Sequence, residues 1–492
     1  MDFQTVDWGT SLLAILPEIL LTILAVAVLA LDMWWPASRR RQIGVIAGVS
    51  MLGIALVLLI FSAPLAGDVP DQLVLGGMFR HDVLTQVFRT MVIVAGALTC
   101  LLSVDVPHLG RKGQYYALLI VATIGASLMS ASADLIMAFV ALETTSITLY
   151  MLAGFLRNDE RSTEAGVKYF LFGAVMSAIL LYGLSLLYGF AGASNFYLLA
   201  DGLRQSGVEG LPVLAALIML LVGFSFKISA VPFHFWTPDV YEGAPTPVTA
   251  FLSVASKAAS FALLMRLFMA VFPEYDPIWV LLLAIASAVT MTLGNLLALR
   301  QSNIKRMLAY SSIAQAGYTL IGVVAIGAQN GAGMAAVTFY MLMYTLTNLA
   351  AFGVVIFLSR ATGTENIADF AGLSRRSPTL ALAMTVAVLS LGGIPPAAGF
   401  FGKFFLFQAA VDSGLTWLAL VGVLNAIVAL YYYLMVIKVM YVDRSADEEE
   451  PLPVSQASRW ALVITTFGII LLGVVASPFY NWALRAGQEL LF

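Results

Sequence analysis

The chain has 492 residues, of which 61% are hydrophobic and only 11% carry a charge. Soluble globular proteins carry about 25% charged residues, because these side chains cover the water-facing surface. A chain this poor in charge cannot cover such a surface, so the composition excludes a soluble protein and indicates an integral membrane protein. The 25 basic and 28 acidic residues nearly balance, which argues against nucleic acid as a partner.

Residues that bind metals or redox groups are few and scattered. The single cysteine, Cys100, lies in an apolar run, and the three histidines are at positions 81, 108 and 234. Because no spacing typical of zinc, haem or iron–sulfur sites occurs, we expect no metal and no redox cofactor in this chain. The first residues contain no basic stretch, so the first apolar run is expected to be a retained helix rather than a cleaved signal peptide.

The apolar residues form long runs. A helix needs about 20 apolar residues to cross a hydrocarbon core about 30 Å thick, and none of the runs alternates as the strands of a membrane barrel do. The predicted fold is therefore an all-α polytopic membrane protein with about 14 transmembrane helices. The runs are 11–34, 43–62, 84–103, 114–132, 134–156, 165–190, 211–238, 247–272, 278–299, 304–327, 333–358, 379–411, 416–441 and 459–484.

The basic residues between these runs gather on alternate connections. If the N-terminus lies outside, the inner connections carry fifteen Lys and Arg residues, and the outer ones carry only Arg80, Arg204 and Arg485. Positive charge is enriched on the cytoplasmic side of membrane proteins, so both termini are predicted on the outer side. The acidic stretch 447–450 is then an inner loop, which we interpret as a solvated tether.

Apart from the eighteen basic residues assigned to the connections, seven of the 25 lie within the runs. Arg89, Arg266 and Lys438 lie within a turn or two of a run's end, where long side chains can reach the membrane interface. Lys168 is close to the inner end of its run and could do the same. These four residues are therefore expected to extend toward water.

Three lysines and one glutamate lie deep in the predicted spans: Lys227, Lys257, Lys403 and Glu143. A charged group at mid-bilayer costs roughly 2.5–3.5 kcal/mol even on the milder insertion scale, so these four should face one another or a hydrated path. An ion pair of Glu143 with one lysine, serving only to hold helices together, is the structural alternative. One carboxylate cannot neutralise three ammonium groups, however, and we predict that these residues form a proton relay.

Two runs contain helix-breaking residues. Pro232 lies in the run 211–238, and Gly392, Pro395 and Pro396 lie in the run 379–411. Proline removes a backbone donor and clashes with the preceding turn, and irregular backbone at membrane depth occurs only where it lines a cavity or is buried in protein. Prolines alone can also kink an ordinary helix. Two breaks at matching positions, each near a lysine, favour discontinuous helices.

The two breaks are five helices apart, so the broken segments cross the membrane in opposite senses. This spacing predicts two inverted five-helix repeats, from the fourth to the eighth helix and from the ninth to the thirteenth, as in many secondary transporters. The single transmembrane domain, 1–492, then divides into four parts. These are the first three helices (1–113), the first repeat (114–272), the second repeat (273–441), and the acidic inner loop with the last helix (442–492).

Other polar residues lie near the predicted relay. His234 follows Lys227 by seven residues, and its titration range suits proton transfer between the inner surface and that lysine; a hydrogen-bonded packing role is the alternative. Hydroxyls and an amide in the run 304–327 could support a water chain, or serve helix packing equally well. They belong to Tyr310, Ser311, Ser312 and Gln315.

Three long motifs, at 232–257, 303–318 and 392–403, resemble one family. They are similar to subunit N of proton-pumping NADH–quinone oxidoreductase, respiratory complex I, the counterpart of mitochondrial NADH dehydrogenase subunit 2. The similarity extends over essentially all fourteen helices. It implies one of three antiporter-like subunits in the membrane arm of a complex in the bacterial inner membrane. NADH, FMN, iron–sulfur clusters and quinone are then expected in partner subunits, and lipids, protons and other membrane-arm subunits are the expected partners.

The resemblance also implies roles for individual residues. A glutamate on the fifth helix pairs with a lysine on the seventh, a lysine on the eighth bridges, and a lysine on the twelfth completes the relay, which corresponds to Glu143, Lys227, Lys257 and Lys403. The Glu143–Lys227 pair is expected to act as an electrostatic switch. Lys168 matches a lysine that modulates the one at position 227. No catalytic redox residue is implied in this chain.

Relatives of that family fit less well. The most distal antiporter-like subunit adds a long lateral helix, and the middle one carries a glutamate where this chain has Lys403. A subunit of a multi-subunit cation/proton antiporter remains the alternative function, because such proteins share the glutamate and the first lysine of the relay. A scaffold subunit with vestigial charges is a third interpretation.

Overall fold

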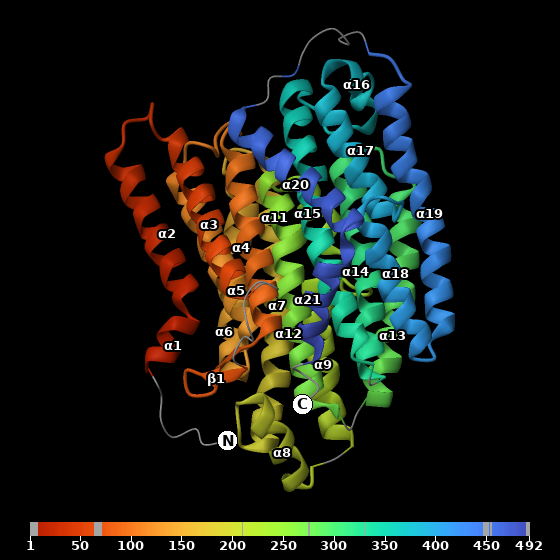
Figure 1. The fold of residues 1–492 in the computed structure, drawn as a ribbon. Coiled ribbons are helices and arrows are strands. Elements are labelled where there is room, and N and C mark those ends of the chain that lie inside the picture. Colours follow the sequence, from red (N-terminus) through yellow and green to blue (C-terminus); the bar gives the residue numbers. More distant parts are fainter. Residues whose placement is uncertain are drawn as a thin grey trace.

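The computed structural model describes residues 8–62, 71–208, 210–273, 276–328, 330–445, 452 and 455–488. These residues form a bundle of long, roughly parallel helices (Figure 1). Thirteen helices in this described part are long and apolar enough to cross a membrane. The predicted span 379–411 is divided between two shorter helices, α17 and α18 (Pro378–Gly392 and Ala398–Asp412), of which α17 is apolar but too short to be counted. The prediction of an all-α polytopic protein is confirmed.

The N-terminal part contains three of the spans. They are preceded by a short helix and interrupted by an antiparallel hairpin in which Gln72 pairs with His81. The sequence pattern predicts neither of these. The elements are α1 (Trp8–Ala14), α2 (Leu16–Trp34), α3 (Arg41–Ser62), β1 (Gln72–Val74), β2 (Phe79–His81) and α4 (Val83–Ser103).

The first predicted repeat contains five spans and one short amphipathic helix, α8, in a connection. Its last span includes one π-helical turn, η1, immediately before Lys257. The elements are α5 (Gly113–Ala131), α6 (Leu135–Ala153), α7 (Glu160–Ala191), α8 (Phe196–Ser206), α9 (Leu211–Ile228), α10 (Trp236–Gly243), α11 (Thr246–Phe251), η1 (Leu252–Ser256) and α12 (Lys257–Val271).

The second predicted repeat and the C-terminal helices complete the bundle. Their elements are α13 (Asp276–Ala298), α14 (Ile304–Gly327), α15 (Ala332–Thr362), η3 (Ile367–Phe370), α16 (Leu373–Arg376), α17, α18, α19 (Thr416–Tyr441), α20 (Gln456–Val474) and α21 (Ala476–Gln488). The acidic stretch 447–450 lies outside the described residues. The division into two repeats stays a prediction.

Both expected helix breaks occur in the structure. Helix α9 ends at Ile228, where Ser229 takes a left-handed conformation, and α10 begins at Trp236, so the backbone around Pro232 is not helical. Likewise α17 ends at Gly392, Gly393 is left-handed, and α18 begins only at Ala398. Each break lies within about ten residues of a buried lysine, Lys227 or Lys403.

The helices differ in how far they are buried. The span α11–η1–α12 is entirely buried within the bundle, and α4, α14 and α15 are nearly so, whereas α2, α7 and α19 expose most of their surface. Lys257 therefore lies at the centre of the protein. Figure 1 shows α1, β1 and α8 at the lower end of the bundle and α16 at the upper end.

Two arginines do not behave as the sequence suggests. Arg89 and Arg266 were expected to extend toward the interface, and both are fully buried, with no exposed surface. The guanidinium of Arg89 contacts the Glu18 carboxylate on α2 at 2.5 Å. Arg266 contacts Asp82, the N-cap residue of α4, at 2.7 Å. The prediction was wrong because internal carboxylates satisfy these guanidinium groups inside the bundle.

Candidate functional site

Glu143 lies in the middle of α6, with its side chain partly exposed. Its carboxylate accepts a hydrogen bond of 2.6 Å from the hydroxyl of Ser177 on α7. Glu143 is a full turn before Ser146, so both side chains lie on the same face of α6. This face of α6 therefore presents a carboxylate and a hydroxyl one above the other.

Lys227 occupies the last turn of α9 and is only 4% exposed. Its ammonium group donates a hydrogen bond of 2.6 Å to the Ser146 hydroxyl and a longer one of 3.5 Å to the Tyr150 hydroxyl. It also lies 5.4 Å from the centre of the Phe226 ring. The lysine is thus held by neutral groups, two of which belong to α6.

The expected direct pair of Glu143 and Lys227 is not formed. Within the described residues, no nitrogen–oxygen contact of 4.0 Å or less joins the two side chains. Ser146 contacts the lysine, and Ser177 contacts the carboxylate. The structure therefore has the separated arrangement of this pair, with the two groups about one turn of α6 apart.

Lys257 begins α12, directly after the π-helical turn η1. Single π-helical turns are frequent at functional sites. The lysine is 2% exposed and donates hydrogen bonds to the Ser312 hydroxyl (2.6 Å) and to the Ser312 carbonyl (2.8 Å) on α14. The Tyr344 hydroxyl on α15 donates to the same serine hydroxyl at 2.7 Å.

Lys403 lies in α18 and is 4% exposed. Its ammonium group donates to the carbonyls of Leu391 (2.8 Å) and Gly392 (3.3 Å), at the end of α17. It also stands over the Tyr318 ring, 4.6 Å from the ring centre. The break between α17 and α18 leaves carbonyls without helical partners, and these carbonyls hold the lysine.

Polar side chains on and around α14 lie between the surroundings of Lys257 and those of Lys403. Beside Ser312, the hydroxyl of Ser311 shares a hydrogen bond of 2.5 Å with the Tyr433 hydroxyl on α19. The Gln315 amide donates to that phenol (3.1 Å) and to the Leu391 carbonyl (3.1 Å), which also accepts from Lys403. We call Ser311, Ser312, Gln315 and Tyr433 the α14 polar chain. Tyr310, also considered from the sequence, forms no hydrogen bond with these four residues in the described part of the chain.

The three deep lysines share one electrostatic property. Throughout the described ranges, none of them has a carboxylate within 4.0 Å. Their partners are hydroxyls, carbonyls and aromatic faces. Such neutral partners stabilise an ammonium ion less than a carboxylate does. The arrangement can therefore hold a proton on each lysine without fixing it there by a permanent ion pair.

Lys168 and His234 differ from the deep lysines. Lys168 lies near the start of α7 with 38% of its side chain exposed, and it contacts Glu164 at 2.6 Å and Asp239 on α10 at 2.9 Å. Asp239 also accepts from Arg306 on α14 at 2.8 Å. His234 lies in the α9–α10 break, and its Nδ1 is buried without a hydrogen-bond partner among the described residues. Within the described ranges, no hydrogen bond connects His234 to Lys227, whose partners are Ser146 and Tyr150.

A family model described as "NADH:quinone oxidoreductase/Mrp antiporter, TM" matches residues 132–429. NADH-quinone oxidoreductase subunit N of Moorella thermoacetica is 42% identical over 471 residues, covering 95% of this chain and 97% of that protein. The chain belongs to the family of NADH–quinone oxidoreductase subunit N. It is a multi-pass integral membrane protein of the antiporter-like type.

Solved structures agree with this assignment. A chain of respiratory complex I from Thermus thermophilus matches this subunit with a TM-score of 0.76 and 32% identity, over 94% of this chain and 97% of that one. A chain of the Mrp complex from Dietzia sp. matches with a TM-score of 0.85 at 21% identity, over 97% and 98% of the two chains. The second likeness shows a common fold. Both relatives are components of multi-subunit complexes.

The structure places several polar residues at the site that the sequence did not single out. Ser146, Tyr150 and Ser177 surround the Glu143–Lys227 region, and Tyr344 and Tyr433 lie around the other two lysines. A signal existed for Ser146 and Tyr150, because they follow Glu143 at helical spacing inside the same apolar run. Tyr344 and Tyr433 lie on distant helices, and their roles depend on packing alone.

Proposed function

We propose that this subunit translocates protons across the membrane through Glu143, Lys227, Lys257 and Lys403, driven by redox chemistry in other subunits. The observation that carries the proposal is the state of the three lysines: each is buried, and none has a carboxylate partner within 4.0 Å in the described part of the chain. A lysine that served only to hold helices together would gain more from an ion pair. The polar chain on α14 supports transfer between the second and third lysines.

The steps follow from the arrangement of these residues. When Glu143 contacts Lys227 directly, its carboxylate stabilises the protonated amine. When the two side chains are not in contact, as in this structure, that stabilisation is weaker and the proton can leave more readily. Lys257 accepts the proton and passes it along the α14 polar chain toward Lys403, which releases it on the outer side. His234 transfers protons between the inner surface and Lys227.

Lys168 acts on this switch from the inner end of α7. Its contact with Asp239 ties α7 to α10, the short helix that follows the break after Lys227. Movement of this contact would therefore change the position of the break. We propose that Lys168 modulates the first lysine in this way and does not carry protons itself.

The redox reactions are assigned to partner subunits. The relatives are named for NADH–quinone oxidoreductase, and we propose that NADH, FMN, iron–sulfur clusters and quinone are bound in those partners. The subunit is then a non-redox part of a translocase. From the distribution of basic residues, we propose the bacterial inner membrane as its location, with both termini on the periplasmic side.

Replacing Lys227 by alanine tests the proposal. The variant is assayed in membrane vesicles that contain the assembled complex, as protons moved per NADH oxidised. Because a positioned proton-transfer group contributes roughly 10²-fold or more to such a step, the transport step should slow by about that factor and the ratio should fall. Lys438→Ala is the control, because Lys438 lies near the end of its span and its one ion pair among the described residues is with Asp443 at the surface.

An unchanged ratio in an assembled Lys227→Ala complex would remove Lys227 from the relay and favour a scaffold role. Sodium/proton exchange by the purified chain in liposomes, without NADH-driven partners, would instead favour the cation/proton antiporter. These two outcomes are distinct, since the first concerns the intact complex and the second the isolated chain.

A further inference from the structure

The turn between α4 and α5 is a tightly wound basic loop. Leu109 is fully buried beneath it, and three backbone hydrogen bonds, Leu109 to Val106, Gly110 to Val106 and Lys112 to Leu109, close it. At Gly110 a Cβ atom would lie 2.2 Å from the Val104 carbonyl, so only glycine fits. His108 takes a left-handed conformation with φ 64°, which is uncommon for a residue with a side chain. The loop is therefore a rigid frame for its exposed side chains.

Two cavities meet at this loop. One, of about 550 Å³, is lined chiefly by basic residues: Arg41, His108, Arg111, Lys112 and Arg360, with Asp105. The other, of about 1060 Å³, shares His108 and Lys112 and extends along α5 and α6. Because they share two residues, we treat them as one site and call it the basic cavity.

The charges of the basic cavity are not balanced within the protein. Asp105 is engaged by Arg41 at 2.5 Å, and Asp159, at the edge of the larger cavity, caps α7 by accepting from the Arg161 backbone. Among the described residues, the side chains of Arg111, Lys112 and Arg360 form no hydrogen bond or ion pair. A concave site with free cations and engaged anions suits an anionic ligand.

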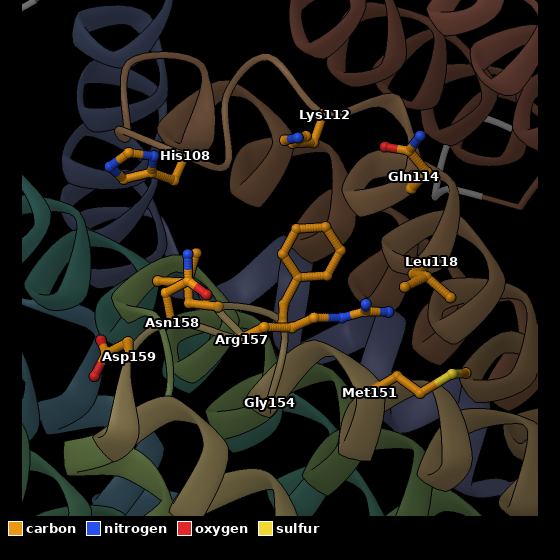
Figure 2. A pocket seen from close by; sticks show the side chains of 11 residues that line it. His108, Lys112, Gln114, Leu118, Met151, Gly154, Arg157, Asn158 and Asp159 are labelled. Atoms are coloured by element: carbon orange, nitrogen blue, oxygen red, sulfur yellow. The ribbon is translucent and has the colours of Figure 1, made fainter.

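Part of the wall of the larger cavity is apolar, formed by Leu118, Met151 and Phe155, and Arg157 adds a further cation to its lining. Figure 2 shows Lys112 and His108 at one edge of this cavity and the side chains of Leu118 and Met151 at the other. Leu118 belongs to the first turns of α5 and Met151 to the last turn of α6, and Met151 is 48% exposed. Both helices are long and apolar enough to span a membrane, and the two residues lie near the helix ends that adjoin the basic loop.

We propose that the basic cavity binds an anionic phospholipid. The phosphate lies against Arg111, Lys112 and His108, with Arg360 opposite, and an acyl chain follows the apolar wall at Leu118 and Met151. Basic pockets between helix ends on the cytoplasmic side of a membrane suit phospholipid headgroups. The apolar wall distinguishes a lipid from free phosphate or from an acidic segment of a partner protein, neither of which would fill it.

The test measures binding to the full-length chain in detergent by native mass spectrometry. The probes are phosphatidylglycerol, phosphatidylcholine and inorganic phosphate. The variants are the double substitution Arg111→Gln with Lys112→Gln, which removes two charges, and Leu118→Trp, which fills the apolar wall. Arg300→Gln is the control, because Arg300 is an exposed basic residue outside both cavities. Elution in size-exclusion chromatography confirms that each variant is folded.

Phosphatidylglycerol should bind the natural chain and Arg300→Gln more strongly than phosphatidylcholine does. The double variant should bind it about tenfold more weakly or worse, given the contribution of each basic residue near an anionic headgroup. Leu118→Trp should weaken the binding of phosphatidylglycerol and leave the binding of inorganic phosphate unchanged. Equal binding of the two lipids, or an unchanged affinity of the double variant, would overturn the site. Full displacement of the lipid by inorganic phosphate, with no effect of Leu118→Trp, would overturn the lipid as its ligand.

Discussion

The two buried arginines expected at the interface and the three deep lysines differ in the chemistry of their partners. The buried arginines, Arg89 and Arg266, have bidentate carboxylate partners, Glu18 and Asp82. The deep lysines have neutral partners. Arginine keeps its proton in proteins, whereas lysine releases its proton readily when buried. The arginines are thus suited to holding helices together, and the lysines to transferring protons.

The Asp82–Arg266 pair should contribute to the stability of the protein. Removing the aspartate should cost more stability than removing the arginine. Asp82→Asn leaves the fully buried Arg266 without a carboxylate, which should cost roughly 3–5 kcal/mol. Arg266→Met should cost less, because the Arg80 guanidinium still lies 3.2 Å from the Asp82 carboxylate. The measurement is the thermal unfolding of the full-length chain in detergent, together with the amount of assembled complex.

The control for this pair is Arg204→Met, which removes one partner of an exposed ion pair of 3.6 Å on α8. It should change stability by less than about 1 kcal/mol. If Arg266→Met destabilises the chain as much as Asp82→Asn, the compensating role of Arg80 is wrong.

At the residue scale the sequence predicts the lysines better than the arginines. The deep lysines are recognisable because each lies many residues from either end of an apolar run. Arg89 and Arg266 lie near run ends, where an interface position and an internal ion pair have the same sequence pattern. Only the packing of α2 against α4 and α5, which brings Glu18 to Arg89 and Ser127, distinguishes the two possibilities.

Each helix break lies near a buried lysine, but the two lysines bind different groups. At the second break, the carbonyls that end α17 bind Lys403 directly. At the first break, Lys227 turns instead toward Ser146 and Tyr150 on α6. The sequence predicts the positions of both breaks from their prolines, but it cannot predict which neighbour receives each lysine, because that depends on the packing of distant helices.

Gly173 on α7 controls the position of Tyr150. A Cβ atom at Gly173 would lie 2.0 Å from the Tyr150 hydroxyl, so Gly173→Ala must move this phenol away from Lys227. The substitution itself favours the helix by about 1 kcal/mol, so loss of α7 is not expected. Because misplacement by about 1 Å can cost up to roughly 10²-fold, proton transport per NADH in vesicles should fall while the complex still assembles.

Gly189→Ala is the matched control, because Gly189 lies on the same helix and a Cβ there would meet nothing within 4 Å. It should leave transport unchanged. Equal transport in both glycine variants would show that the position of Tyr150 does not matter for the relay.

At the scale of the whole molecule, α14 connects the two predicted repeats. It packs against α10 of the first repeat and against α18 of the second. Lys257, from the first repeat, bonds to Ser312 on α14, and Lys403, from the second, stands over Tyr318 on the same helix. The sequence motif at 303–318 and the repeat spacing suggest that this helix is important. The hydrogen bonds that cross from it to α17 and α19 cannot be predicted from local patterns.

Tyr433 is the residue through which this connection can be tested. Its hydroxyl joins Ser311 to Gln315 in the α14 polar chain. The adjacent Tyr432 is also buried and its ring packs against that of Tyr433, but its hydroxyl donates to Asn295 on α13. Tyr433→Phe and Tyr432→Phe each remove one phenol without changing the packing, and each should cost roughly 1 kcal/mol of stability. Tyr433→Phe should lower the protons moved per NADH in vesicles with assembled complex more than Tyr432→Phe does, because only the Tyr433 hydroxyl belongs to the proposed route from Lys257 to Lys403. Equal ratios in the two variants would mean that protons reach Lys403 by another route, and a loss in Tyr432→Phe alone would place that route on the α13 side of α14.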